Sequence, residues 1–177
     1  FLRPSTRAIV VCLPLLRKSA DACLANVSSL FGLTGIAFQS AYCASKFAIR
    51  GYTESLRMEA MHYFPHVNIL SIHPGGVSTH IADTAIKTGF REDKDAAKDI
   101  AKFNKALVMP PKVAAQTILK GIAARKTRLL IGKDAKASDL IARMFPQGYT
   151  KVGLREARRR NILPLEYAGF KRTDAPE

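Results

Sequence analysis

Two side chains that can exchange a proton, Tyr42 and Lys46, lie four residues apart. Residues 41–64 have the apolar spacing of a long helix and contain no Pro, so the two side chains are expected on one helix face, one turn apart. A free phenol has a pKa of about 10. A nearby ammonium favours the phenolate, so Lys46 is predicted to lower the pKa of Tyr42 toward the range of a general acid and base.

A serine, Ser29, is the third candidate for this chemistry. The apolar run 22–28 is too short for a buried helix and is followed by Gly32 and Gly35, which is typical of a buried strand. Ser29 then lies just past the strand, where active sites of parallel sheets are found. We expect the following loop to turn the Ser29 hydroxyl toward Tyr42, where it would hold a substrate oxygen during proton transfer.

The elements that must position these residues alternate along the chain. Helices are expected over 5–18, 41–64, from Pro110-Pro111 onward, and from a cap at Asp134 to Met144; strands are expected over 22–28, 67–72 and 128–132. This alternation predicts an α/β fold with a parallel sheet covered on both faces. Residues 79–107 are expected to form short helices over a mobile region, and the chain from Pro146 a basic, partly helical tail.

A known family shares this pattern. Ser29, the thirteen-residue step to Tyr42 and the Tyr-x-x-x-Lys that follows resemble the active site of the short-chain dehydrogenase/reductase family. The strand 67–72 followed by Pro74-Gly75 and Thr79 is similar to that family's second cofactor loop. The resemblance covers nearly the whole chain, above all 13–132. It implies the C-terminal half of a Rossmann-like, doubly wound parallel sheet with flanking helices, in one partial NAD(P)-binding domain over 1–177 that ends in a basic tail at about 146–177.

The resemblance implies a role for each matching residue. Ser29 would orient the substrate oxygen, Tyr42 would act as general acid and base, and Lys46 would lower the pKa of Tyr42 and hydrogen-bond the nicotinamide ribose. Gly75 would let the backbone approach the cofactor where a side chain would clash. The cofactor would be NAD or NADP, and the implied cofactor contacts are Tyr42, Lys46, Pro74, Gly75, Gly76, Val77 and Thr79.

The chain also departs from the family pattern. No Gly-x-x-x-Gly-x-Gly turn precedes Ser29, so the pyrophosphate-binding segment is expected to be absent and the chain to be N-terminally truncated. The family's catalytic Asn would fall at or before Phe1. The strand 22–28 would then be an uncovered sheet edge, which invites pairing with another chain. We therefore expect marginal stability, or completion by another polypeptide.

Two functions follow from these observations. The first is that of an oxidoreductase that uses NAD(P) to interconvert an alcohol and a carbonyl in a small-molecule substrate. Whether this chain alone is active is an open question. The alternative is a catalytically inactive remnant or interaction protein that keeps the catalytic half of the fold. The family commonly pairs subunits through two long helices, so a homo-oligomer is expected through residues near 9–16 and 44–63.

Other polar and apolar residues favour structural roles. His73, beside Pro74, is predicted to be a packed strand-end residue rather than a base, and Asn26 a residue that hydrogen-bonds backbone at a strand end. The four histidines have no metal-ligand spacing, so no metal is expected. Core or subunit-contact positions are predicted for Met58, Met61, Tyr63 and Phe64.

The net charge of +14 could indicate a partner that carries phosphates. However, Lys and Arg are spread along the chain with one dense run, Arg155–Arg160, and no nucleic-acid motif accompanies them. A solvated basic surface is therefore expected, and no nucleic-acid partner.

Cys12, Cys23 and Cys43 lack metal spacing, which favours free thiols in a reducing compartment. No apolar run reaches the roughly 18 residues of a membrane span. A cytoplasmic enzyme without a membrane partner is therefore expected.

Overall fold

The computed structural model describes residues 2–37, 39–79, 101, 104, 105, 107–159, 166, 167, 170 and 171, with side chains described between Ile9 and Arg159. The helices are α1 (Leu2–Leu16), α2 (Ser40–Tyr63), α5 (Pro111–Ala123), α6 (Lys133–Met144) and α7 (Tyr149–Arg159), with a short 3-10 helix η1 (Leu30–Gly32). The strands are β1 (Ala22–Val27), β2 (Val67–Pro74), β3 (Arg128–Ile131), β4 (Glu166–Tyr167) and β5 (Phe170–Lys171).

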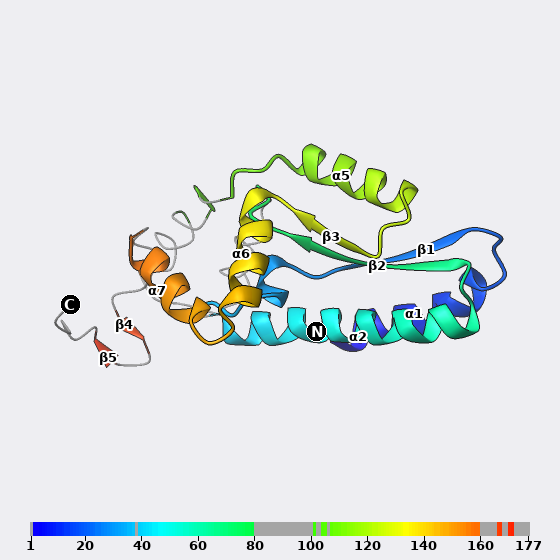
Figure 1. Cartoon of the computed structure of the whole chain (residues 1–177), viewed down its shortest axis with the longest axis horizontal. Helices are drawn as coiled ribbons and strands as arrows, with labels where there is room; N and C mark the ends of the chain where they lie inside the picture. The colour runs from blue at the N-terminus through cyan, green and yellow to red at the C-terminus, as the bar shows by residue number, and fades with distance from the viewer. Residues whose placement is uncertain are drawn as a thin grey trace.

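The first three strands form one parallel sheet in the order β1-β2-β3. β1 runs alongside β2 from Ala22 opposite Val67 to Val27 opposite Ile72, and the shorter β3 runs alongside Ser71–Pro74. Helices α1 and α2 cover one face of the sheet and α5 covers the other (Figure 1). The predicted α/β fold with flanking helices is therefore confirmed.

The core lies on both sides of β2, whose residues 67–73 are all buried. Because both faces are covered, the apolar residues of β2 do not follow an in-out alternation. The cluster beneath the sheet contains Ile9, Ala22, Leu56, Ala60, Phe64, Val67 and Ile69. The cluster beneath α5 contains Leu70, Ile72, Ala114, Leu129 and Ile131.

The predicted elements are confirmed with small shifts at their ends, except for one cap. Pro65 follows the end of α2, and Pro111 is the first residue of α5. The N-cap of α6 is Gly132, and no side chain caps that helix, so the prediction that Asp134 caps it was wrong. The expected short helices over 79–107 fall almost entirely outside the described residues. In the predicted tail, α7 is helical as expected.

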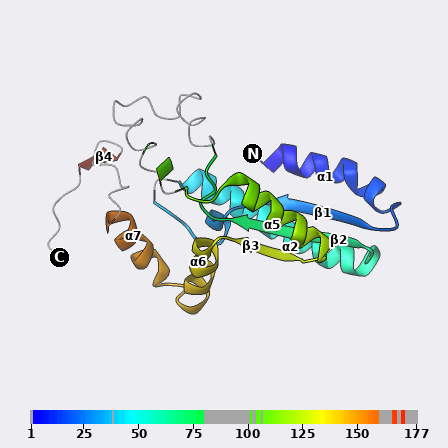
Figure 2. The same ribbon diagram turned by 90° about the horizontal axis from the view of Figure 1, so that it is seen from above.

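The strand β1 is an edge in the part of the sheet that the structure describes, since it pairs there with β2 alone. Seen from above, α1 lies on the β1 side of the sheet, whereas α5 and α6 lie toward β3 (Figure 2). Among the described residues, β1 therefore lies at the edge of the sheet, where the sequence places residues 22–28. Whether another polypeptide covers that edge stays a prediction.

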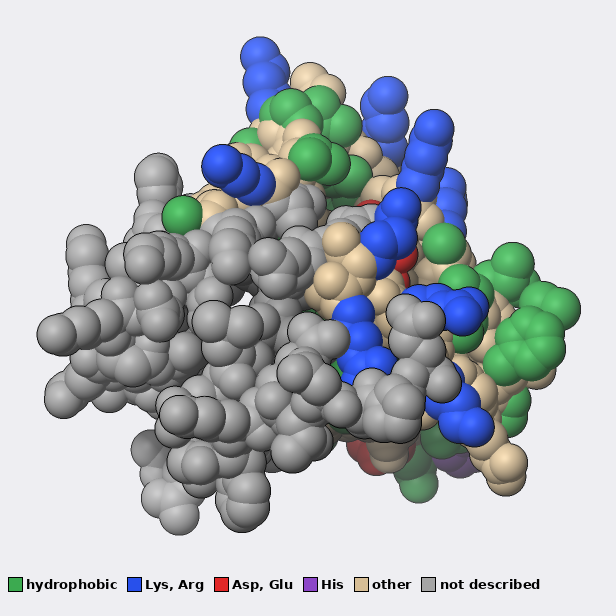
Figure 3. All heavy atoms as spheres, turned by 90° about the vertical axis from the view of Figure 1, so that its left-hand side faces the viewer, with side chains coloured by type: hydrophobic (Ala, Val, Ile, Leu, Met, Phe, Trp, Pro, Cys, Tyr) green, Lys and Arg blue, Asp and Glu red, His purple; other side chains and the backbone are tan. Residues whose placement is uncertain are grey.

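The surface carries many separate cations, as expected. Figure 3 shows Lys and Arg side chains projecting at several places on the described part of one face, with hydrophobic side chains gathered near its top and at its right. The described cysteines are free, with Cys12 exposed and Cys43 buried. None of the described helices is long and apolar enough to cross a membrane. Among the same residues, no three His, Cys, Asp or Glu side chains converge as metal ligands would.

Candidate active site

The structure brings Ser29, Tyr42 and Lys46 together at the carboxyl edge of the sheet. Ser29 is buried just after β1, while Tyr42 and Lys46 lie half-buried on the first turns of α2. The Lys46 ammonium nitrogen lies 5.5 Å from the centre of the Tyr42 ring. The predicted arrangement on one helix face is thus present, and the catalytic roles of these residues stay a prediction.

The Ser29 hydroxyl is oriented by its own loop. Its Oγ accepts a hydrogen bond of 3.1 Å from the Phe31 N–H and so caps η1. The Ser29 hydroxyl also forms a side-chain hydrogen bond with Tyr42. That bond lowers the pKa of Tyr42, but burial of the phenol is the larger influence, and the pKa of Tyr42 is raised overall. This direction is opposite to the one predicted from the sequence.

The side chain of Lys46 contacts the end of β1. Its ammonium donates a 3.3 Å hydrogen bond to the Val27 carbonyl. Partial burial lowers the pKa of Lys46, since a low-dielectric surrounding disfavours the charged form. An ammonium has three N–H donors, so the bond to Val27 leaves Lys46 able to donate to a hydroxyl group at the same edge.

A second serine and a glycine fix the Ser29 turn, residues 28–32, against α2. The Ser28 hydroxyl donates a 2.8 Å hydrogen bond to the backbone carbonyl of Lys46. A Cβ atom on Gly32 would collide with the Ser28 hydroxyl and press on the Lys46 carbonyl. Gly32 therefore allows the turn to pack directly onto the helix that carries Tyr42 and Lys46. The sequence contains both residues, but it gives no sign of this contact.

His73 holds the Ser29 turn from the sheet side. The histidine is fully buried, its Nδ1 lies 3.1 Å from the Ser29 carbonyl oxygen, and its Nε2 lies 2.8 Å from the Ser71 hydroxyl. A carbonyl can only accept, so Nδ1–H donates to Ser29 and Nε2 accepts from Ser71. Burial lowers the pKa of His73, which keeps the ring neutral. This agrees with the predicted packed strand-end residue, although the sequence did not reveal the link to Ser29.

The next strand ends in the glycine loop, residues 74–77. The Gly75 N–H donates to the Ile131 carbonyl at 2.8 Å, and the Gly76 N–H donates to a carboxylate oxygen of Asp134 at 2.6 Å. A Cβ atom on Gly75 would collide with that carboxylate. In this structure, the Asp134 carboxylate occupies the space that a side chain at position 75 would need. The sequence suggested that a cofactor would occupy it.

The remaining predicted contacts lie along the same loop or beside it. Pro74 ends β2, Val77 forms an isolated β-bridge with Met109, and Thr79 is exposed two residues later.

Two structural predictions had mixed outcomes. Asn26 donates to the Thr53 hydroxyl at 2.9 Å, so the prediction of a backbone partner was wrong. Of the apolar positions predicted for core or subunit contact, Phe64 is buried in the core; Met58, Met61 and Tyr63 are exposed.

The donor set fits one end of a nicotinamide cofactor. A serine hydroxyl, a phenol and an ammonium lie close together, and hydrogen-bond donors of this kind suit the hydroxyl groups of a ribose. The contacts of Tyr42 and Lys46 with a nicotinamide ribose stay a prediction.

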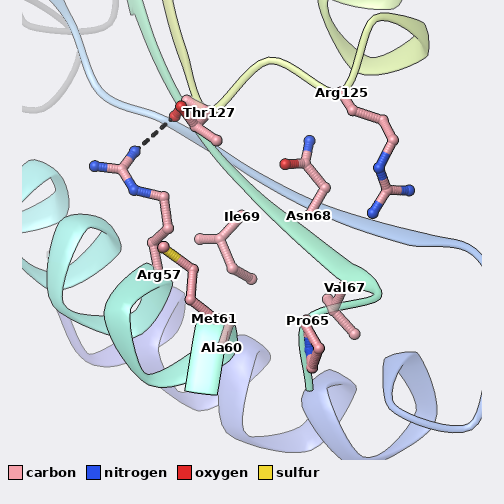
Figure 4. Close-up of a pocket in the computed structure, with 9 residues that line it drawn as sticks. All are labelled: Arg57, Ala60, Met61, Pro65, Val67, Asn68, Ile69, Arg125 and Thr127. Carbon is pink, nitrogen blue, oxygen red and sulfur yellow. Dashed lines mark hydrogen bonds between the residues drawn. The ribbon is translucent and has the colours of Figure 1, made fainter. Parts of the chain in front are cut away.

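A cavity of about 270 Å³ lies at the other end of β2 (Figure 4). Its walls come from the end of α2, the start of β2 and the residues before β3, namely Arg57, Ala60, Met61, Pro65, Val67, Asn68, Ile69, Arg125 and Thr127. The Arg57 guanidinium donates to the Thr127 carbonyl at 2.9 Å, and Arg125 is paired with Asp21. Because Ser29, Tyr42 and Lys46 lie beyond the opposite ends of these strands, this cavity is separate from the candidate active site.

Known proteins share both the sequence and the fold. SadH of Mycobacterium tuberculosis, which is named as an oxidoreductase, is 38% identical over 141 residues, covering 79% of this chain and 50% of SadH. The 3-ketodihydrosphingosine reductase of Bacteroides thetaiotaomicron is 32% identical over 144 residues, covering 80% of this chain and 47% of the reductase. The chain therefore spans about half the length of these curated relatives.

A solved structure and a family model agree with these relatives. A short-chain dehydrogenase/reductase from Burkholderia phymatum, solved in complex with NAD, superposes with a TM-score of 0.66 at 20% identity, over 85% of this chain and 55% of that one. The model of the family described as short chain dehydrogenase matches residues 3–88, which include Ser29, Tyr42, Lys46 and the glycine loop. This chain belongs to the short-chain dehydrogenase/reductase family of oxidoreductases.

Proposed function

We propose that this chain supplies the proton-transfer site of an enzyme that interconverts an alcohol and a carbonyl with NAD or NADP. The observation that carries the proposal is the convergence of a buried serine hydroxyl, a tyrosine hydrogen-bonded to it and a lysine beside the tyrosine ring. When bound, the nicotinamide cofactor would supply or accept the hydride. The residues of this chain would position the substrate and move the proton.

In the direction of carbonyl reduction, Ser29 would donate a hydrogen bond to the substrate oxygen and so hold it near Tyr42. Negative charge develops on that oxygen during the reaction, and Tyr42 would neutralise it by giving up its phenolic proton. Lys46 would stabilise the resulting phenolate by its positive charge. The raised pKa of Tyr42 keeps the phenol protonated and ready to act as the acid.

The substrate proposed is a small molecule with a secondary alcohol or ketone. One relative is named for reducing a ketone on a long-chain sphingoid base, so ketones attached to long alkyl chains belong in the first test panel. Exposed apolar residues on α1 and α2, including Val10, Val11, Met58 and Met61, support the predicted homo-oligomer. The oligomer and the cytoplasmic location both stay predictions.

The test is a hydride-transfer assay on the purified chain with NADH and NADPH and a panel of short- and long-chain ketones. Tyr42→Phe should lower the rate at least a hundredfold without changing the melting temperature by more than about 2 °C, because the variant keeps the ring and loses only the hydroxyl that carries the transferable proton. Tyr52→Phe, also on α2, is the matched control and should keep the rate. If the wild-type chain transfers hydride and Tyr42→Phe keeps that rate, or if the wild-type chain has no activity and binds neither cofactor, the proposal fails.

A further inference from the structure

The turn between β3 and α6 directs one carboxylate out of its own helix. Gly132 has a backbone φ of 99°, a conformation that side-chain-bearing residues rarely adopt. Asp134 follows two residues later, and α6 has no side-chain cap. The Asp134 carboxylate instead accepts the Gly76 N–H, 58 residues earlier in the chain, at 2.6 Å. Because the acceptor is a charged carboxylate, this hydrogen bond is stronger than one between two neutral groups at the surface.

Two glycines make room for that carboxylate. A Cβ atom on Gly75 would overlap both of its oxygens, and one on Gly132 would overlap one of them. The Gly75 N–H also donates to the carbonyl of Ile131, the residue before Gly132. Gly75, Gly76, Gly132 and Asp134 therefore form one interlocked unit, which we call the Asp134 clamp.

The helix that begins at the clamp also reaches the Ser29 turn. α6 packs against η1, which follows Ser29. Beyond α6, the Tyr149 hydroxyl accepts a 3.3 Å hydrogen bond from the Gly35 N–H, just past η1. The segment from Gly132 to Tyr149 thus contacts the loops that follow two neighbouring strands, one at each of its ends.

We propose that Asp134 is a positioning residue of the candidate active site, one that fixes the glycine loop relative to the Ser29 turn. The inference rests on the proposed function, because the glycine loop matters for activity only if it contacts the cofactor. The clamp sets the position of the loop backbone at the edge of the sheet where Ser29, Tyr42 and Lys46 lie. Asp134 itself acts through Gly76 and touches none of the three proposed catalytic side chains.

A double-mutant cycle in the full chain tests the clamp itself. Gly75→Ala should raise the unfolding equilibrium constant at least tenfold when Asp134 is present, and much less in the background of Asp134→Ala, where the collision is gone. Gly132→Ala should destabilise both backgrounds, because its φ is strained whatever the carboxylate does, and it should destabilise more when Asp134 is present, because its Cβ would also overlap a carboxylate oxygen. Asp21→Ala, which removes another exposed carboxylate, should be additive with Gly75→Ala. Additive effects of Gly75→Ala and Asp134→Ala would overturn the clamp.

Positioning is tested by Asp134→Asn, which keeps the shape of the side chain and removes its charge. Hydrogen exchange at the Gly76 amide should accelerate about tenfold or more, and the dissociation constants for NADH and NADPH should rise several-fold, with little change in melting temperature. A merely structural residue would change the melting temperature and leave the dissociation constants unaltered, which would overturn the inference. If the wild-type chain binds neither cofactor although the cycle shows coupling, the proposed function fails, and the positioning role fails with it.

Discussion

The Ser29 turn and the glycine loop follow neighbouring strands at the same edge of the sheet, yet different forces shape them. Neutral, buried groups hold the Ser29 turn: the His73 ring, the Ser28 hydroxyl and the close contact at Gly32. An exposed carboxylate, that of Asp134, holds the glycine loop. The comparison separates two kinds of sensitivity: the first loop depends on shape and desolvation, whereas the second depends on charge and is therefore open to screening by salt.

The largest effect is expected from Gly32→Ala. The added methyl would collide with the Ser28 hydroxyl and press on backbone atoms of Lys46, which cannot move without shifting α2. We expect a loss of about 3 kcal/mol in the free energy of unfolding, measured by urea denaturation and unchanged by 0.5 M NaCl.

Gly51→Ala is the control for Gly32→Ala. Gly51 lies in the middle of α2, and a Cβ atom there would meet no atom within 4 Å. This variant should gain about 0.5 to 1 kcal/mol, because Ala favours a helix over Gly. A similar loss in both glycine variants would show that shape does not fix the Ser29 turn.

His73→Leu is expected to cost about 2 kcal/mol at pH 8, because it leaves the buried Ser71 hydroxyl and the Ser29 carbonyl without their partner. The cost should shrink at lower pH. The pKa of His73 is lowered in the folded protein, chiefly by burial; the hydrogen bond to the Ser29 backbone and the charge of Glu54 act against this, and Arg128 and Arg50 act with it. The unfolded chain therefore takes up a proton first, so wild-type stability is full above about pH 6.5 and falls as the pH drops below that value.

The measurement is urea denaturation of the two proteins between pH 5 and pH 8. The wild-type curve should bend downward below about pH 6.5 more steeply than the His73→Leu curve. Parallel curves would mean that His73 does not stay neutral in the folded protein, and the account of the Ser29 turn as a neutral, buried contact would be wrong.

The smallest effect is expected from Asp139→Asn, which tests the charged side of the comparison. Asp139 accepts from Arg128 of β3 and from Arg143, and these partners lower its pKa to about 2. Its contribution is present above the unfolded pKa of about 4 and is lost as the pH falls through about 2. The variant keeps one acceptor oxygen, so we expect a loss of about 1 kcal/mol at pH 7 in thermal or urea unfolding.

The salt dependence of Asp139→Asn tests the charged contact between α6 and β3. Its cost should diminish in 0.5 M NaCl, in contrast to that of Gly32→Ala. A cost that is independent of salt would indicate that α6 is held to β3 by packing rather than by charge.

Patterns along the chain predict the elements well, because apolar spacing and prolines act locally. The run 41–64 became α2, Pro65 follows it, and the placement of Tyr42 and Lys46 one turn apart required only helical geometry. The errors involve contacts between distant residues. Asp134 at the start of a helix has the sequence of a cap, and only the backbone turn at Gly132 directs it to Gly76 instead. Likewise, burial of Tyr42 reverses the pKa shift that its neighbour Lys46 predicts, and burial is a property of the folded chain.

The parallel arrangement of β1, β2 and β3 has a consequence for how the protein folds. The bonds that shape the candidate site join His73 to Ser29 and Asp134 to Gly76, which are 44 and 58 residues apart. Loops of this length must close before such bonds can form, and proteins rich in distant contacts fold slowly. Protection of the Gly76 amide should therefore develop only after β3 and α6 have docked, later than protection of the local hydrogen bonds within α2. The site would be among the last parts of the molecule to take shape.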